Sequence, residues 1–285
     1  MRRLKKIFKI IGIVMGILIV GLFIAVHVLL KPRSDEKVLE QLDNLHHKPH
    51  IFYNSFKEYT YRVVAMQKKI DTTLPTLVFV HGSPGSVLDY SRYFKDSLIN
   101  TKANILGYDR IGYGVNNAGE VNGTIAFELD ILHDVTKDIP SEKIVLIGYS
   151  YGGPVVLASP KHYKYKVSLA SSISAELEPM FWMLNLYKWK LTRPLIPTLL
   201  KAASQEKYAH LMDLPNYKDK WNVSPSPVVN IHGDEDWIVP YKNSTILKKQ
   251  IDENKFTMVT IDGGGHELIW SDFTLIKNEI LKILQ

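Results

Sequence analysis

Residues 143–153 read KIVLIGYSYGG, an apolar run that leads into a serine flanked by glycines. Such a short run, rich in β-branched residues, is typical of a strand buried inside a parallel sheet. Gly148 and Gly152 give Ser150 the Gly-x-Ser-x-Gly pattern of a sharp strand-to-helix turn, where a β-carbon at either glycine would collide with its neighbours. The pattern predicts that Ser150 is a nucleophile, the alternative being a glycine-rich turn with an incidental serine.

The same alternation of buried strand and helix continues on both sides of this turn. Thr124 can cap one helix, and the last helix carries apolar residues at helical spacing. We therefore predict an α/β fold, a mostly parallel sheet covered by helices on both faces, with functional residues at the carboxyl ends of the strands. The other expected strands are 59–67, 76–81, 104–108, 166–170, 228–232 and 256–261.

The alternation stops between about residues 174 and 221, where helical stretches rich in aromatic residues are broken by prolines. We interpret this segment as a helical cap inserted over the sheet. Its tryptophans, Trp182 and Trp189, are expected to line a substrate pocket. Two alternatives remain: the aromatic residues and nearby cations could rest on a membrane surface, or they could complete the core.

The loop His81–Gly85 (HGSPG) follows another expected strand. A loop at this place can direct a backbone N–H toward the carbonyl oxygen of a bound ester, together with the N–H of the residue after the nucleophile. Ser83 and Tyr151 are the candidates for this oxyanion hole. The alternative is a plain turn, since glycine and proline favour turns for their own reasons.

Five motifs, taken in chain order, resemble those of the α/β-hydrolase superfamily, and the resemblance covers about residues 59–285. It implies a catalytic triad in the chain order serine, acid, histidine. It also implies that Asp109 and Arg110 brace the end of the sheet and do not act in catalysis. The motifs are HGSPG (81–85), YDRIGYG (108–114), GYSYGG (148–153), HGDEDWIVP (232–240) and GGGH (263–266).

The resemblance implies Asp236 as the acid and His266 as the base. In the family pattern the acid stands three positions after a glycine and shortly before Val-Pro or Ile-Pro, which fits Asp236 better than its neighbours Asp234 and Glu235. In some relatives the acid follows the preceding strand, so Glu176 and Glu178 remain alternatives. His266 follows three glycines that can deliver its imidazole to a distant serine.

A Ser-His-Asp triad predicts acyl transfer from a small-molecule substrate through an acyl-enzyme, without metal or organic cofactor. A serine nucleophile argues against the epoxide hydrolases and haloalkane dehalogenases of the family. The expected substrate is a carboxylic ester. Because HGSPG also resembles the loop of proline iminopeptidases, an aminopeptidase that holds a free amine at Glu176 or Glu178 is an alternative, as is a non-catalytic binding protein on the same scaffold.

The chain of 285 residues has no cysteine, which excludes a thiol nucleophile and a disulfide framework. Its net charge of +6 comes from the N-terminus, because residues 1–33 hold seven basic residues and no acidic one. The rest carries 28 Lys and Arg against 29 Asp and Glu, so we expect no nucleic-acid partner.

Residues 10–30 form an apolar run interrupted only by His27, long enough to span the roughly 30 Å core of a bilayer. Most basic residues precede the run, which predicts a signal anchor with a cytoplasmic N-terminus and a catalytic domain outside. A cleaved signal peptide is the alternative. The expected organisation is a basic tail and transmembrane helix (1–33), a stalk (34–58), and the catalytic domain (59–285).

Overall fold

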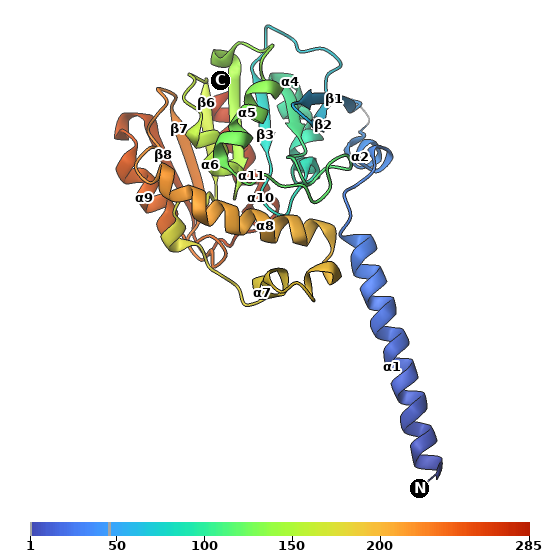
Figure 1. The fold of residues 1–285 in the computed structure, drawn as a ribbon. Coiled ribbons are helices and arrows are strands. Elements are labelled where there is room, and N and C mark those ends of the chain that lie inside the picture. Colours follow the sequence, from blue (N-terminus) through green and yellow to red (C-terminus); the bar gives the residue numbers. More distant parts are fainter. Residues whose placement is uncertain (1, 45–46) are drawn as a thin grey trace.

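The computed structural model describes residues 2–44 and 47–285. An eight-stranded sheet lies at its centre, in the order β1-β2-β4-β3-β5-β6-β7-β8 (Figure 1). β2 pairs antiparallel with β1 and β4, and all other neighbours are parallel. The strands are β1 (His50–Phe56), β2 (Tyr59–Ala65), β3 (Thr76–Val80), β4 (Asn104–Tyr108), β5 (Ile144–Tyr149), β6 (Tyr165–Leu169), β7 (Val228–Gly233) and β8 (Phe256–Ile261).

Helices cover both faces of the sheet, and the period of two along each strand divides its side chains between two cores. In β3, Leu77 and Phe79 pack under one helical layer, whereas Val78 and Val80 pack under the other. The first layer comprises α2 (Asp35–Leu42), α3 (Ser91–Phe94), α4 (Ser97–Lys102), α10 (Leu268–Ser271) and α11 (Phe273–Ile283). The second comprises α5 (Ile125–Val135), α6 (Gly152–Ala158) and α9 (Lys242–Gln250).

The seven strands expected from the sequence correspond to β2–β8, and the predicted α/β architecture is confirmed. The segment expected to form a stalk, 34–58, differs from the expectation. α2 buries Val38 and Leu42 completely in the core, and β1 pairs with β2 along its whole length. Apart from residues 45–46, which the structure does not describe, this segment is therefore packed against the sheet.

A helical segment connects β6 to β7, and between these strands the fully described residues 170–227 contain no strand. It consists of α7 (Leu184–Lys188), α8 (Thr198–Asp213) and three short 3-10 turns. α8 crosses in front of the lower ends of the strands in Figure 1, and α7 lies farther out, beyond α8 (Figure 1). The cap expected at about 174–221 corresponds to this segment.

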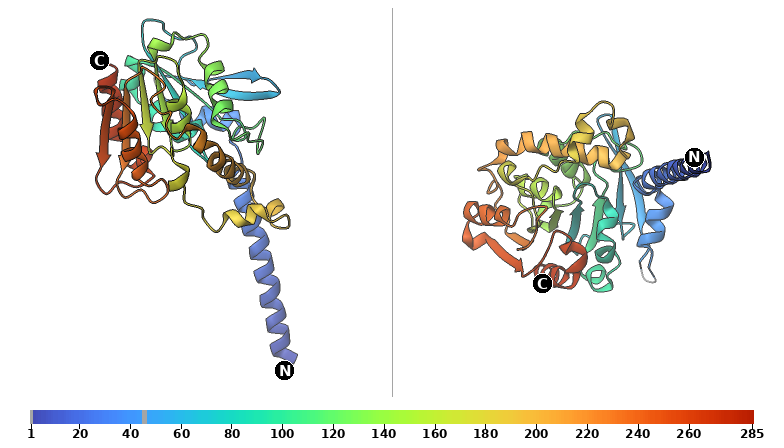
Figure 2. Two further views of the ribbon diagram at one scale, coloured as in Figure 1. Left: turned by 60° about the vertical axis from the view of Figure 1, so that its left-hand side comes forward. Right: turned by 90° about the horizontal axis from the view of Figure 1, so that it is seen from below.

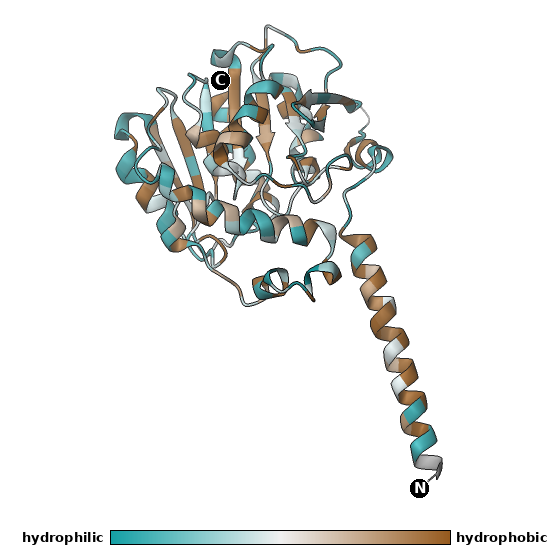
Figure 3. Cartoon of the chain, in the orientation of Figure 1, coloured by the Kyte–Doolittle hydropathy of each residue, from teal (hydrophilic) through white to brown (hydrophobic). Residues whose placement is uncertain are grey.

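α1 (Arg2–Leu29) leaves the domain as one long helix, apolar along most of its length (Figures 1 and 3). Within it, Lys5–Leu29 is long and apolar enough to cross a membrane, judged by length and composition alone, and its apolar stretch is not buried against the domain. The same properties are found in signal sequences.

Candidate active site

Ser150 lies on a tight turn between β5 and α6, with a positive φ of 52°. This left-handed conformation is unfavourable for a residue with a β-carbon. The turn also has no space for side chains beside it. A β-carbon at Gly148 would lie 2.3 Å from the carbonyl oxygen of Gly152, and one at Gly152 would lie 2.1 Å from that of Val80. The two glycines therefore allow β3, β5 and α6 to converge under the serine.

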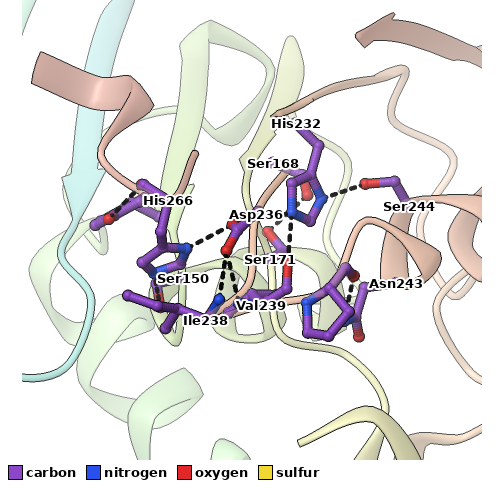
Figure 4. Close-up of polar contacts among 12 residues, drawn as sticks. Ser150, Ser168, Ser171, His232, Asp236, Ile238, Val239, Asn243, Ser244 and His266 are labelled. Atoms are coloured by element: carbon purple, nitrogen blue, oxygen red, sulfur yellow. Dashed lines mark hydrogen bonds and ion pairs between the residues drawn. The ribbon is translucent and has the colours of Figure 1, made fainter. Parts of the chain in front are cut away.

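His266 and Asp236 come from the loops after β8 and β7, and the structure brings both to Ser150 (Figure 4). The Nε2 atom of His266 lies 3.1 Å from Ser150 Oγ, and its Nδ1 atom lies 2.7 Å from Asp236 Oδ2. The two loops meet through glycines, because a β-carbon at Gly233 would lie 2.1 Å from the carbonyl oxygen of Gly264. All three side chains belong to buried residues.

The Asp236 carboxylate is held by four hydrogen bonds. Its Oδ1 accepts the backbone N–H groups of Ile238 and Val239 at 2.9 and 2.8 Å, and its Oδ2 faces His266 and, at 3.2 Å, His232 Nε2. Burial alone would raise the pKa of Asp236, but the hydrogen bonds from His232 and His266 outweigh it and hold the pKa well below its usual range. Asp236 is therefore a carboxylate at neutral pH.

The alternative acids lie in other environments. Asp234 and Glu235 are exposed to solvent, and an Oδ1 atom of Asp234 accepts the backbone N–H of Gly263. Glu176 is exposed and pairs with Lys218 at 2.8 Å. Glu178 pairs with Lys207 of α8 and accepts a hydrogen bond from the Tyr151 hydroxyl at 3.0 Å.

His232 contributes to the site, although the sequence shows it only as the end of a strand. Its Nδ1 atom lies 2.6 Å from Ser244 Oγ, and its Nε2 atom lies 2.9 Å from the carbonyl oxygen of Val239. Asn230 donates to Ser244 Oγ at 2.8 Å, which leaves the Ser244 proton for Nδ1. The hydrogen-bond network thus assigns the His232 proton to Nε2, directed at the Val239 carbonyl and Asp236. No sequence pattern marks this pair, because it depends on the fold of the loop.

The HGSPG loop lies beside Ser150. A β-carbon at Gly82 would lie 3.0 Å from the β-carbon of Ser150, so the backbone that leads into Ser83 passes close to the serine. The Ser83 hydroxyl lies 2.6 Å from that of Tyr113. Tyr151 directly precedes α6, whose N-terminus favours negative charge.

Arg110 braces this loop from behind. It is buried, and its Nη1 donates to the carbonyl oxygens of His81 and Gly82 at 3.3 Å each. Two buried carboxylates balance its charge: Glu128 of α5, at 3.2 Å, and Glu206 of α8. Burial, together with the Arg110 charge, lowers the pKa of His81 to about 3, so that ring is neutral. This arrangement agrees with the expectation that Arg110 braces the end of the sheet. The contribution of Glu206 was not predicted from the sequence.

The tryptophans of the cap are not enclosed. Trp182 is 73% exposed and Trp189 is 58% exposed. This differs from the expectation that they line a substrate pocket. Other cap residues contact Tyr151, which follows Ser150: Glu178 accepts a hydrogen bond from its hydroxyl, and the His210 ring of α8 lies 4.3 Å from its ring, centroid to centroid.

Within residues 2–44 and 47–285, no group of three or more His, Asp or Glu side chains is arranged to hold a metal ion.

Known proteins resemble this chain in part of its sequence and in its fold. Over 91 residues the chain is 36% identical to a proline iminopeptidase of Saccharolobus solfataricus, a match that spans 31% of this chain and 29% of that protein. Among solved structures, a candidate lipase of Acinetobacter baumannii superposes with a TM-score of 0.65 at 17% identity, covering 88% of this chain and 97% of that one. A membrane phospholipase A, described as a bacterial virulence factor, has a TM-score of 0.59 at 13% identity and covers 100% and 99%.

At these identities the structural matches speak for the fold alone. A match to a family sequence model is more specific. The model described as "Alpha/beta hydrolase family" matches residues 77–273, which is more than half of the chain and includes Ser150, Asp236 and His266. The chain therefore belongs to the alpha/beta hydrolase family.

Proposed function

We propose that this chain is a membrane-anchored serine hydrolase that cleaves a carboxylic ester with Ser150, His266 and Asp236. The observation that carries the proposal is the continuous hydrogen-bonded chain Ser150–His266–Asp236, with heavy-atom distances of 3.1 and 2.7 Å. Both distances are within the range in which a base can take a proton from the nucleophile.

In this mechanism Ser150 Oγ attacks the acyl carbon while His266 Nε2 takes its proton. Asp236 stabilises the imidazolium, and the backbone N–H groups of Ser83 and Tyr151 stabilise the oxyanion. His266 then gives the proton to the leaving alcohol, which leaves an acyl group on Ser150. Water then attacks the acyl-enzyme, with His266 again acting as base. When the resulting tetrahedral intermediate breaks down, the carboxylic acid is released and His266 returns the proton to Ser150.

The local match to a proline iminopeptidase makes an aminopeptidase the main rival. Such an enzyme needs a carboxylate to bind the free amine of its substrate. Glu176 and Glu178, the two candidates, are paired with Lys218 and Lys207. A substrate amine would have to displace a lysine at either position, which favours the ester.

The anchor is part of the proposal. The length and composition of Lys5–Leu29 support a membrane span, and its flanking charges support a cytoplasmic N-terminus. A membrane phospholipase A shares the fold over the whole chain, α1 included, and its description as a membrane protein agrees with the proposed anchor.

A fluorophosphonate probe tests the nucleophile on the full-length protein in detergent or lipid. We expect labelling of the wild type and none of Ser150→Ala. A panel of esters, thioesters and aminoacyl amides then tests the substrate class, with turnover expected on the esters. Wild-type turnover by Ser150→Ala on every active substrate, or turnover on the amides alone, would overturn the corresponding part of the proposal.

A further inference from the structure

The domain is tied closely to the end of the apolar helix. α1 ends at Leu29, and the carbonyl oxygen of Arg33 already accepts a hydrogen bond from Nη1 of Arg62 at 2.8 Å. Arg62 is itself buried and pairs with Asp109 and with Asp35, the first residue of α2. The backbone is thus fixed to the domain from Arg33 onward.

Only residues 30–32 connect the helix to this fixed point. Three residues span at most about 11 Å when extended. The polar headgroup layer on each side of a bilayer is roughly 5–8 Å thick. If α1 spans a membrane, the side of the domain next to α1 therefore lies against the headgroups.

The cap faces this side. α7 lies on the end of the domain from which α1 leaves, and in two views it extends past the start of the emerging helix (Figures 1 and 2). It belongs to residues 180–201, which we call the cap ridge. α7, all of whose residues the structure describes, has no fully buried residue, and Trp182 and Trp189 on either side of it are exposed. Completing the core therefore does not account for the two tryptophans.

The cap ridge concentrates exposed apolar side chains. From residue 35 onward, sixteen large hydrophobic residues in the described part of the chain are exposed, and seven of them lie in these 22 positions. Leu191 is 87% exposed, more than any other of the sixteen. Such a concentration of exposed apolar side chains in one short segment is typical of an interaction site. The seven residues are Met180, Trp182, Met183, Trp189, Leu191, Leu195 and Leu200.

The charge of the cap ridge is one-sided. It holds four basic residues and no acidic one, and Lys188 and Lys190 are exposed beside Trp189. Tryptophan and lysine together favour the boundary between lipid headgroups and acyl chains. Basic side chains near the surface add attraction to anionic lipids.

We propose that the cap ridge docks on the surface of the same membrane that holds α1, with its apolar side chains among the headgroups. The inference rests on the proposed anchoring by α1. The occupant is the bilayer and not a second protein, because the three-residue connection leaves the domain within reach of the headgroups. Docking places the cap beside lipid, and its helix α8 contacts Tyr151, the residue after Ser150.

The absence of cysteine in the chain allows a direct test on the full-length protein. Single cysteines are introduced at Met183 in the ridge, at Lys69 on the opposite end of the domain, and at Ile17 in α1, and each is labelled with a fluorophore. The proteins are reconstituted in phosphatidylglycerol–phosphatidylcholine vesicles that contain lipids with a shallow or a deep nitroxide quencher. Met183→Cys keeps both tryptophans, and Lys69 is an exposed control.

We expect the shallow quencher to reduce fluorescence several-fold more at position 183 than at 69, and the deep quencher to act at 17. Replacing Lys188 and Lys190 by Gln should shift the equilibrium from docked to undocked by about fivefold per lysine, because each adds roughly the attraction of one cation near an anionic surface. Pure phosphatidylcholine should have the same effect as the double variant.

The outcomes separate the inference from the proposal beneath it. Quenching at 17 but none at 183 overturns the docking and leaves the anchor intact. No quenching at 17 overturns the anchor itself. Energy transfer between ridge labels on two molecules, without quenching at 183, would assign the ridge to a second copy. If the label at position 183 became shielded from a water-soluble quencher only after Ser150 is acylated, the ridge would belong to the substrate pocket. Either result overturns the docking.

Discussion

Replacement of His232 by Phe tests whether the Asp236 carboxylate depends on a second histidine besides His266. The His232 ring is completely buried, and its Nε2 donates toward Asp236 Oδ2 at 3.2 Å. A hydrogen bond to a charged group contributes about 1.5–3 kcal/mol. Phe has a similar shape but removes this bond and leaves Ser244 without its acceptor. We expect the free energy of unfolding at pH 7 to fall by about 2 kcal/mol.

The effect on catalysis should be smaller than that of removing the acid. Asp236 keeps its bond to His266 and the two backbone N–H groups at Oδ1. We therefore expect His232→Phe to lower kcat/KM by about tenfold, or about 1.4 kcal/mol. Asp236→Asn, which imposes the wrong tautomer on His266, should cost about 10⁴-fold.

The stability effect also has a defined pH dependence. The pKa of Asp236 is lowered in the folded protein, so its contribution is present above the unfolded pKa of about 3.9 and is lost as pH falls through the folded pKa. Without His232 the folded pKa moves up toward the unfolded one. The difference between variant and wild type should therefore be constant above about pH 5 and shrink on acidification.

Urea denaturation of the detergent-solubilised protein and steady-state turnover of the best ester measure these effects. His162→Phe is the matched control, since His162 is exposed, and should change stability by less than about 0.5 kcal/mol. The reasoning fails if His232→Phe matches that control in both stability and kcat/KM.

Four further predictions follow from the structure. Ser150→Ala should lower kcat by about 10⁶-fold with little loss of stability, and the double variant with Asp236→Asn should be no worse, since the residues act as a unit; additive losses in kinetics would contradict this. Gly152→Ala should give little folded protein in a thermal melt, because its β-carbon would meet the Val80 backbone at 2.1 Å; a wild-type melting temperature would refute it. Glu206→Gln removes a charged partner of buried Arg110, so it should lower the free energy of unfolding by about 3 kcal/mol in denaturation. It should also lower kcat more than it raises KM; a change in KM alone would rule out an effect on the loop before Ser83. Alkaline-phosphatase fusions after residue 60 should be active in bacterial cells, whereas fluorescence of the matching green-protein fusions would reverse the orientation.

The fold was predictable because its signals are local. Apolar strands such as 144–149 end in glycine turns, and the same turns carry the motifs that bring Ser150 and His266 to one edge of the sheet. The packing of 34–58 was not predictable in the same way. α2 is short, and only its two buried residues, Val38 and Leu42, show that it belongs to the core. Proline and charge in the flanking sequence suggest a linker until the sheet is known.

The site shows the same division. Ser150 and His266 stand in glycine-rich contexts that few other functions require, whereas the supporting residues have ordinary surroundings. His232 lies four positions before Asp236, and Glu206 lies within a helix of mixed composition. The role of His232 depends on how the loop after β7 folds, and that of Glu206 on its contact with Arg110, 96 positions away. A single sequence carries no record of such pairs.

The residues that support the site form two separate hydrogen-bonded groups. Asp236 is braced by His232, which is held by Ser244 of α9 and, through Ser244, by Asn230 of β7. The loop before Ser83 is braced through Arg110 by Glu206, which comes from the cap. A movement of α8 would therefore act on the loop proposed to hold the oxyanion, and would leave the hydrogen bonds among Ser150, His266 and Asp236 in place. Changes in the cap should for this reason alter transition-state stabilisation, while labelling of the serine by a fluorophosphonate persists at a reduced rate.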